Sequence, residues 1–393
     1  MTIKHSGRRD LAIINRSFWP VYPVIGEALL RLAEDLAGGK KVSVIMQDHA
    51  DIHTSLRKGK RGANVEFFSG KAWSTSASGL FVRALDAVYF MLWVVFALLR
   101  SRPKTVYVST DPPVLVPFVV AVYCALFRAK FIYHLQDIHP EAANVVIKVH
   151  PLLFTVLQRI DCFSMRRADV VITITEEMAE EIRKRSGTRS PINIEGNPAV
   201  SFDEVSQPPN KKKGLTFCGN AGRLQRIPLL IDSITQYLDA GGKLEFAFAG
   251  GGIYSSALAE LAEKYDEVDF WGQITPAEAA QLNCNYEWAL LPIEDEVTRY
   301  AFPSKSSSYV FARTAVLAVC GDDTSVAEWV SSQNLGVVCS PDVASLVGTF
   351  IRIESGELCS ADFDGDREGL KAKLSFDHFV ARLKSSIPVG EIG

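Results

Sequence analysis

The chain has 393 residues, of which 48% are hydrophobic and 22% are charged. This composition is typical of a folded, soluble protein with two domains and argues against disorder. The seven cysteines are scattered from Cys124 to Cys359 without a C-x-x-C pair. That usage disfavours a disulfide framework or a zinc ribbon and indicates a reduced, cytoplasmic protein. No apolar stretch directly follows the polar residues 1–10, so we expect no secretory signal.

Charge is distributed unevenly, although the net charge is only −3. Residues 1–200 carry 26 Lys and Arg against 18 Asp and Glu, whereas residues 201–393 carry 16 against 27. A basic amino-terminal half favours anionic partners such as phospholipid headgroups or a lipid diphosphate. The alternative is that two solvated surfaces differ in charge without a functional reason.

The amino-terminal half alternates short β-branched runs with helical patterns. A helix is expected over Glu27–Leu36, where leucine and alanine recur at helical spacing. Expected strands are Leu11–Ile14, Val42–Met46, Val65–Phe68, Thr105–Ser109, Lys130–Leu135, Val170–Thr175 and Ile192–Glu195. This alternation predicts a mostly parallel sheet covered on both faces.

Two longer apolar runs, Ala87–Leu99 and Pro112–Phe127, raise the question of membrane segments. Both are shorter than the roughly 18 to 20 uninterrupted apolar residues that a spanning helix requires. We therefore expect buried helices of an α/β domain. The alternative is a peripheral position on the membrane that uses the flanking arginines and Trp93.

A stretch rich in Pro, Asn, Ser and Lys, from Gly196 to Gly214, separates two α/β patterns. We expect an amino-terminal domain over 1–200, a linker over 201–214 and a carboxy-terminal domain over 215–375. Expected strands of the second domain are Leu215–Cys218, Leu244–Ala249, Val268–Trp271, Trp288–Leu291, Ala315–Val319 and Gly336–Cys339. Thr275 and Glu278 form a capping box with Pro276 at the first helical position, which predicts a helix start.

Several polar groups of the second domain are candidates for binding an anion. Two glycine-rich turns follow expected strands, and glycine permits close approach of the backbone to a ligand. Lys305 and three serines open a short expected helix, whose free N–H groups and dipole favour a diphosphate. Arg223 or Arg226 would add a second positive charge. The candidate binding residues are Gly219, Asn220, Gly222, Arg223, Arg226, Gly251, Ser304, Lys305 and Ser308.

A polar cluster, Gln136 to Glu141, directly follows the expected strand Lys130–Leu135. Asp137 at a strand end could bind sugar hydroxyls or stabilise positive charge on an anomeric carbon. The alternative is that Asp137 caps the next helix, with Pro140 in its first turn. His139 is interpreted as a supporting residue and His134 as a buried, hydrogen-bonded histidine.

These segments resemble the retaining, nucleotide-sugar-dependent glycosyltransferases of family four, which have the two-domain GT-B fold. Within that family, the sequence is similar to bacterial enzymes that build surface polysaccharides of the colanic-acid and O-antigen kind. The resemblance covers Leu11 to about Val380. It is carried by residues 15–20, 136–141, 167–169, 219–225 and 303–318.

The resemblance implies an α/β protein of two Rossmann-like domains whose parallel sheets face an interdomain cleft. The second domain would bind a nucleotide-sugar donor, a UDP-sugar rather than a GDP-sugar, without a metal or other cofactor. The first domain would bind a lipid-linked or oligosaccharide acceptor, and residues 376–393 would return to it as a helix. Gln136, Asp137 and Lys305 would be catalytic. The expected protein extends exopolysaccharide or O-antigen in the cytoplasm, peripherally at the inner membrane face, and binds no nucleic acid.

The sequence also departs from the family pattern. Many relatives carry glutamate at the positions of Ser308 and Tyr300, and histidine at the position of Gln136. Two alternatives therefore stay open: a catalytically silent GT-B subunit that binds a partner or a saccharide, and a sugar-nucleotide epimerase. An NAD-dependent oxidoreductase is disfavoured because no G-x-G-x-x-G follows the first expected strand.

Overall fold

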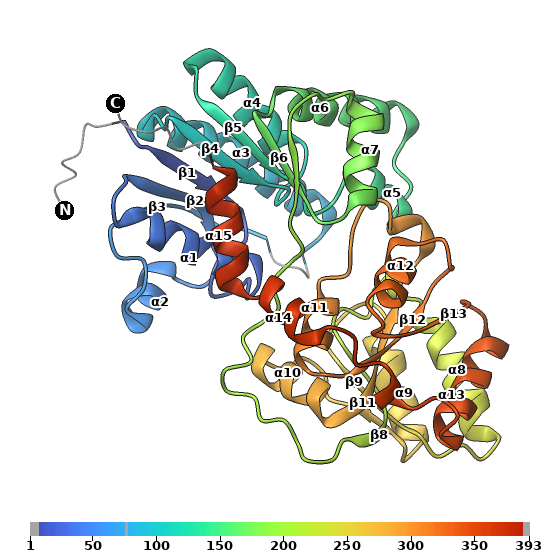
Figure 1. The fold of residues 1–393 in the computed structure, drawn as a ribbon. Coiled ribbons are helices and arrows are strands. Elements are labelled where there is room, and N and C mark those ends of the chain that lie inside the picture. Colours follow the sequence, from blue (N-terminus) through green and yellow to red (C-terminus); the bar gives the residue numbers. More distant parts are fainter. Residues whose placement is uncertain (1–7, 75–77, 388–393) are drawn as a thin grey trace. The chain divides into compact units, whose positions relative to one another are not determined.

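The computed structural model describes residues 8–74 and 78–387 and divides the chain into two compact units (Figure 1). Unit 1 comprises the residues up to Asn197 together with those from Phe376 onward, and unit 2 comprises Pro198–Ser375. Part of the expected linker is wrong, because a strand already begins at Lys212. Gly214 was expected to end the linker, but it lies inside the strand. Its backbone packs so closely against the adjacent strand that a Cβ there would lie 2.1 Å from the Glu245 carbonyl oxygen.

Unit 1 contains a seven-stranded parallel sheet with the order β3-β2-β1-β4-β5-β6-β7. The order reverses between β1 and β4, so the loops that follow these two strands lie at the topological switch point. Its strands are β1 (Leu11–Ile14), β2 (Val42–Asp48), β3 (Val65–Lys71), β4 (Thr105–Ser109), β5 (Lys130–His134), β6 (Val170–Thr173) and β7 (Ile192–Ile194).

Helices cover both faces of this sheet (Figure 1). One face is covered by α1 (Ile25–Ala37) and α15 (Phe376–Ser386), which pack on each other. The other face is covered by α3 (Leu80–Ser101), α4 (Leu115–Phe127), α6 (Pro151–Arg167) and α7 (Glu176–Ser186). Two further helices, α2 (Ile52–Gly59) and α5 (Glu141–Val146), follow β2 and β5.

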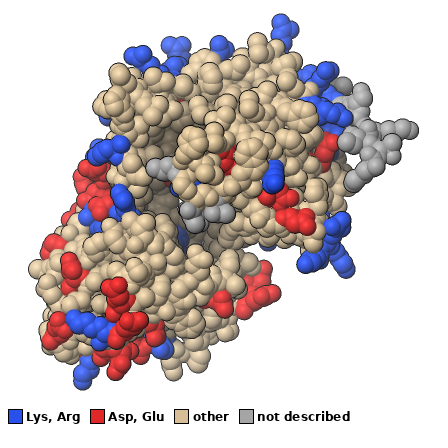
Figure 2. Space-filling view, turned by 180° about the vertical axis from the view of Figure 1, so that it is seen from behind, with Lys and Arg blue, Asp and Glu red and all other residues tan. Residues whose placement is uncertain are grey.

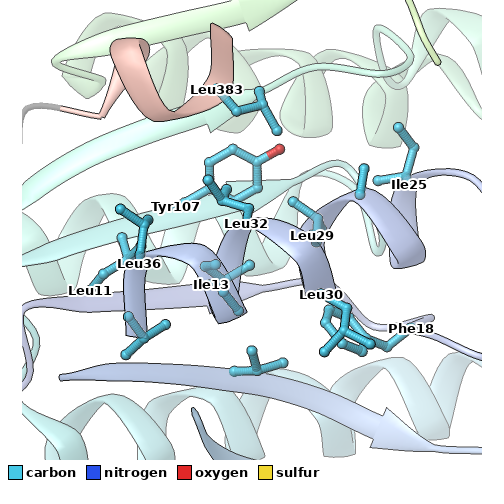
Figure 3. Packing of buried hydrophobic residues seen from close by; sticks show 14 of the residues in the cluster. Leu11, Ile13, Phe18, Ile25, Leu29, Leu30, Leu32, Leu36, Tyr107 and Leu383 are labelled. Carbon is cyan, nitrogen blue, oxygen red and sulfur yellow. The ribbon is translucent and has the colours of Figure 1, made fainter. Parts of the chain in front are cut away.

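The carboxy-terminal helix α15 completes the core of unit 1. Leu383 is fully buried and packs in one cluster with Tyr107, Leu29 and Leu32 (Figure 3). Ion pairs fix both sides of the helix: Arg382 Nε lies 2.9 Å from Glu195, and Lys384 Nζ lies 2.6 Å from Asp35. After the chain leaves unit 2, the leucine and phenylalanine residues at helical spacing in α15 therefore pack against the sheet of unit 1.

The expectation that both long apolar runs form buried helices is wrong for α3. This helix begins at Leu80, and only 28% of an apolar stretch of 18 residues within it is buried. It is also the one helix among the described residues that is long and apolar enough to cross a membrane. The pattern misled because α3 is apolar on its outer side as well as on the side that packs against the sheet.

Unit 2 contains a six-stranded parallel sheet with the order β10-β9-β8-β11-β12-β13, which reverses between β8 and β11. Its strands are β8 (Lys212–Cys218), β9 (Glu245–Ala249), β10 (Val268–Phe270), β11 (Tyr286–Pro292), β12 (Ala315–Val319) and β13 (Gly336–Cys339). Its helices are α8 (Ile227–Asp239), α9 (Ser255–Lys264), α10 (Pro276–Asn285), α11 (Lys305–Phe311), α12 (Ser325–Ser332), α13 (Val343–Ser355) and α14 (Arg367–Lys373). The predicted capping box of Thr275 and Glu278 is confirmed at the start of α10.

Candidate functional site

The two glycine-rich turns of unit 2 interlock at the carboxyl edge of its sheet. The Gly219 N–H donates to the Ala249 carbonyl, and the Ala221 N–H donates to the Gly251 carbonyl at 2.7 Å. A Cβ on Gly250 would lie only 2.0 Å from the Gly219 carbonyl oxygen. Glycine is therefore required here by backbone contact between neighbouring turns, and the turns that follow β8 and β9 form one surface.

Lys305 is the first residue of α11, and its ammonium group lies beside the first of these turns. Nζ is buried, although the residue as a whole stays partly exposed, and it lies 3.6 Å from the centroid of the Phe217 ring. A Cβ built on Gly219 would lie 2.8 Å from Nζ. Nζ has no hydrogen-bond partner in the part of the chain that the structure describes. An ammonium buried in this way is costly unless an anion or a hydrogen-bond acceptor joins it.

Burial lowers the pKa of Lys305 to about 7, and the nearby Cys218 opposes that shift only weakly. The ring face of Phe217 offers the cation an electrostatic contact but no hydrogen bond. In this conformation the ammonium faces Phe217, so contact with a bound diphosphate requires rotation about its side-chain torsions. The lysine therefore combines a flexible stem, a depressed pKa and a position at the switch point of the sheet.

The two candidate arginines have different surroundings. Arg226 donates to the Ile293 carbonyl at 2.7 Å and pairs with Asp295 at 3.0 Å and Glu294 at 3.2 Å. Arg223 is exposed and makes no hydrogen bond or ion pair with any described residue. Arg226 thus holds the loop after β11 against the turn after β8, and Arg223 is the arginine whose charge is uncompensated.

The remaining predicted residues of unit 2 shape these loops. The Gly222 N–H donates to Gln225 Oε1 at 3.1 Å, and a Cβ on Gly222 would lie 2.6 Å from the Asn220 side-chain nitrogen. Ser304 precedes α11 and is exposed, whereas Ser308 is buried within that helix. The structure therefore brings Gly219, Gly251 and Lys305 together and places Ser308 inside the fold.

In unit 1, Gln136 and Asp137 follow β5, next to the loops at the switch point. The Thr110 hydroxyl accepts the backbone N–H groups of Gln136 at 3.1 Å and Asp137 at 3.4 Å. The alternative of a capping role for Asp137 is wrong, because α5 begins at Glu141 with Pro140 as its N-cap and no side-chain cap. The carboxylate of Asp137 is consequently free for another role.

A second carboxylate, Asp111, was missed by the sequence analysis, and its negative charge acts on Asp137. It follows β4 and accepts the Ser17 N–H at 2.7 Å, and its carbonyl accepts the Arg16 N–H. Burial, and then the negative charge of Asp111, raises the pKa of Asp137 to about 6. Tyr22 is 45% exposed as a residue, but desolvation of its hydroxyl, and then the negative charges of the same two carboxylates, raise the pKa of Tyr22 to about 12. The sequence signal that could have identified Asp111 is its position two residues after the expected strand Thr105–Ser109.

A buried hydrogen-bonded chain orients Gln136. His134 is fully buried and its ring nitrogens contact Tyr107 Oη and Gln136 Nε2, the latter at 2.5 Å, which confirms the interpretation of His134 as a satisfied core histidine. Burial lowers the pKa of His134 to about 3, so the imidazole is neutral. Its ring therefore serves as a neutral acceptor for the Gln136 side chain and fixes it at the end of β5.

Arg185 of α7 holds the loop that carries Asp137. Its guanidinium pairs with buried Glu141 and Asp161 and donates to the His139 carbonyl at 2.9 Å. Arg185→Ala would leave two buried carboxylates unpaired, so we expect a loss of about 3 to 5 kcal/mol in the free energy of unfolding, measured by urea denaturation.

The matched control is Arg183→Ala, two residues away on the same helix. Arg183 is exposed and lies 3.4 Å from Glu176, so its removal should cost less than about 1 kcal/mol. Equal effects of the two substitutions would contradict a supporting role for the Arg185 network.

Comparison with known proteins rests on structure alone, because no protein-family model and no curated protein matches this sequence. HepE of Anabaena, solved in complex with UDP, is 14% identical with a TM-score of 0.66, and the match covers 96% of this chain and 99% of HepE. Sucrose-phosphate synthase of Thermosynechococcus elongatus is 14% identical with a TM-score of 0.70, covering 96% and 98%. The lipopolysaccharide outer core galactosyltransferase WaaB is 15% identical with a TM-score of 0.62, covering 96% and 98%. Two parallel sheets flanked by helices, matched over nearly the full length of these structures, show that this chain has the GT-B fold of two Rossmann-like domains.

Proposed function

We propose that this protein is a glycosyltransferase that moves a sugar from a nucleoside-diphosphate donor to a saccharide acceptor. One observation carries the proposal: the buried Lys305 ammonium, which has no hydrogen-bond partner among the described residues, lies beside two interlocked glycine turns at the switch point of unit 2. Such a position favours a diphosphate, because the lysine ammonium, rotated from the Phe217 ring toward the turns, would compensate its negative charge. The likeness to a UDP-bound protein and to a galactosyltransferase supports the same activity.

In the proposed reaction, the bond between the anomeric carbon and the donor diphosphate breaks while the acceptor hydroxyl oxygen forms the new glycosidic bond. The acceptor proton leaves with the diphosphate. Lys305 and Arg223 stabilise the negative charge that develops on the leaving group. The ionised Asp137 stabilises positive charge on the sugar ring, and Gln136 helps to position it. The sequence resemblance further supports retention of anomeric configuration and a lipid-linked acceptor.

The test is to titrate the full-length protein with UDP and GDP by calorimetry and to assay a panel of UDP- and GDP-sugars for nucleotide release with and without saccharide acceptors. Micromolar binding of UDP, with turnover that depends on an acceptor, is the expected result. Absence of nucleoside-diphosphate binding would support a silent GT-B subunit. Sugar conversion from the donor alone would instead identify an epimerase.

A glycine substitution tests the contact between the turn and the lysine. In Gly219→Ala the added methyl would lie 2.8 Å from Lys305 Nζ, so the ammonium must move. We expect kcat/KM to fall roughly 10- to 100-fold through misplacement of the charged group, as measured with the best donor of the panel. Gly348→Ala is the control, because a methyl there meets nothing within 4 Å on the same unit. Equal activity of both variants would separate Gly219 from the donor site.

A further inference from the structure

The outer side of α3 carries a continuous apolar stripe. Its members recur at intervals of three or four residues, so they lie on one side of the helix. The stripe consists of Phe81, Leu85, Val88, Leu92, Phe96 and Leu99, with exposed fractions from 43% for Val88 to 75% for Phe81. A helix that only covers a sheet would present polar side chains there, so this stripe requires a separate explanation.

The neighbouring helices extend this apolar surface. α4 packs against α3 and α6 packs against α4, so the three helices lie in sequence across one face of the unit 1 sheet. Exposed apolar residues on α4 and at the start of α6 are Leu115, Leu126, Phe127, Leu152, Leu153 and Val156. We call these residues together with the α3 stripe the outer helical face.

Charge on these three helices has one sign at the surface. They contain two acidic residues, Asp86 and Asp161, and both are fully buried. The basic residues of α3 and α6 are all exposed: Arg83, Arg100, Arg159, Arg166 and Arg167. Figure 2 shows a broad area of uncharged residues on the rear of this unit, with Lys and Arg along its edges and a few Asp and Glu toward one side.

The inner side of α3 fixes its orientation relative to the sheet. Phe90, Val94 and Leu98 are fully buried, and Asp86 accepts hydrogen bonds from Gln47 at 2.8 Å and from Ser74. Crossing a bilayer would require the helix to leave these partners and expose the sheet. The structure therefore favours a helix that lies flat, with its outer side available to another apolar phase.

We propose that the outer helical face docks on an anionic phospholipid bilayer. Apolar side chains would enter the boundary between headgroups and acyl chains, and the arginines would contact lipid phosphates. A second copy fits less well, because pairing this face with itself would bring arginines of the two copies together. This inference concerns a surface separate from the turns of unit 2, and it does not depend on the proposed reaction.

The experiment is cosedimentation of the full-length protein with preformed vesicles of phosphatidylcholine, with or without 30% phosphatidylglycerol. We expect preferential binding to the anionic vesicles and release as salt is raised. The triple variant Leu85→Gln, Leu92→Gln, Phe96→Gln should lose binding. Each arginine removed in Arg83→Gln and Arg100→Gln should weaken binding about fivefold at low salt, as expected for one basic residue near an anionic surface.

The matched control is Ile253→Gln, Trp271→Gln, Ile351→Gln, which removes three similarly exposed apolar residues from unit 2. This control should bind vesicles as the unaltered protein does. Binding by the α3 variant equal to that of the control would overturn the proposal. The proposal would also be overturned if the unaltered protein did not bind vesicles and sedimented as a dimer that the α3 substitutions convert to a monomer. UDP titration of the α3 variant separates the two proposals, since it should still bind nucleotide.

Discussion

Lys305→Met is expected to lower kcat/KM by roughly 100- to 1,000-fold while raising the melting temperature. The loss follows from removing the positive charge that Lys305 carries when a diphosphate is bound and that stabilises the leaving group, an effect comparable to deleting one oxyanion donor. The gain in stability follows because the ammonium nitrogen is buried without a hydrogen-bond partner in residues 8–74 and 78–387, and a methionine of similar length fills the space without that cost. Donor turnover and a thermal melt of the same preparation measure both effects.

Proton linkage gives this prediction a second, independent measurement. The pKa of Lys305 is about 7 in the free protein, so most of the side chain is neutral at pH 8. A bound diphosphate would raise that pKa, and binding at pH 8 should therefore take up most of one proton. Calorimetry in two buffers of different ionisation enthalpy measures the uptake, which should disappear in Lys305→Met and persist in the exposed control Lys264→Met. Unchanged proton uptake in Lys305→Met would remove this lysine from the donor site.

The stability of the free protein should also depend on pH through Lys305. Its folded-state pKa lies below the ordinary value of 10.5, so the unfolded chain binds more protons between pH 7 and 10.5. Stability from this group therefore increases as pH rises through that window and is constant below it. The difference in melting temperature between Lys305→Met and the unaltered protein should shrink from pH 7 to pH 9.

Asp137→Asn is expected to lower kcat by roughly 100- to 10,000-fold, because an ionised carboxylate that stabilises developing positive charge is replaced by a neutral amide. The pKa of Asp137 is about 6 and that of Lys305 is about 7, so kcat/KM of the unaltered protein should rise with pH around a midpoint near 6 and fall above about 7, where Lys305 of the free protein loses its proton. The pH profile of kcat/KM over pH 5 to 8 measures this midpoint. A profile that is flat across this range would contradict an essential ionised Asp137.

Asp111→Asn tests the cause of the shift. Removing the neighbouring negative charge should move the activity midpoint below 6, whereas burial would still raise the pKa of Asp137 above its ordinary value. The raised pKa of Asp137 also affects the pH dependence of stability. The pKa of Asp137 in the folded protein is above its ordinary value of 3.8, so as pH rises Asp137 loses its proton in the unfolded chain before it does so in the folded protein. Stability contributed by Asp137 is therefore lost as pH rises from about 4 to 6, by at most about 3 kcal/mol. Asp137→Asn should abolish that part of the pH dependence.

Much of the fold could be predicted because both sheets are parallel and buried on both faces. Their strands read as short β-branched runs, and Leu11–Ile14, Thr105–Ser109 and Ala315–Val319 have the predicted bounds. The ends of strands were harder to predict where polar residues take part in the backbone pairing of the sheet. Lys212 and Lys213 look like linker residues, yet backbone pairing with β11 and β9 holds this segment in the sheet, independently of side-chain polarity.

The turns after the strands, on which the candidate site residues lie, could be predicted from the sequence, but the interactions between their side chains could not. Glycine turns and polar residues after strands pointed to Gly219, Gly251 and Asp137 through local pattern alone. Sequence could not reveal that Arg226 is held by Asp295, that Lys305 lies on Phe217, or that the charge of Asp111 acts on Asp137. These interactions join residues 26 to 88 positions apart in the sequence, and no local spacing encodes them.

The return of α15 makes unit 1 discontinuous along the chain, whereas unit 2 is a single uninterrupted segment. During synthesis, the first sheet is made before α15, so it lacks Phe379 and Leu383 until residues 376–386 emerge. Unit 2 can therefore complete its core on the ribosome while unit 1 still exposes the surface that α15 will cover. A truncation after residue 375 would leave that apolar surface on an otherwise intact sheet, so loss of the last helix would damage the domain that begins the chain.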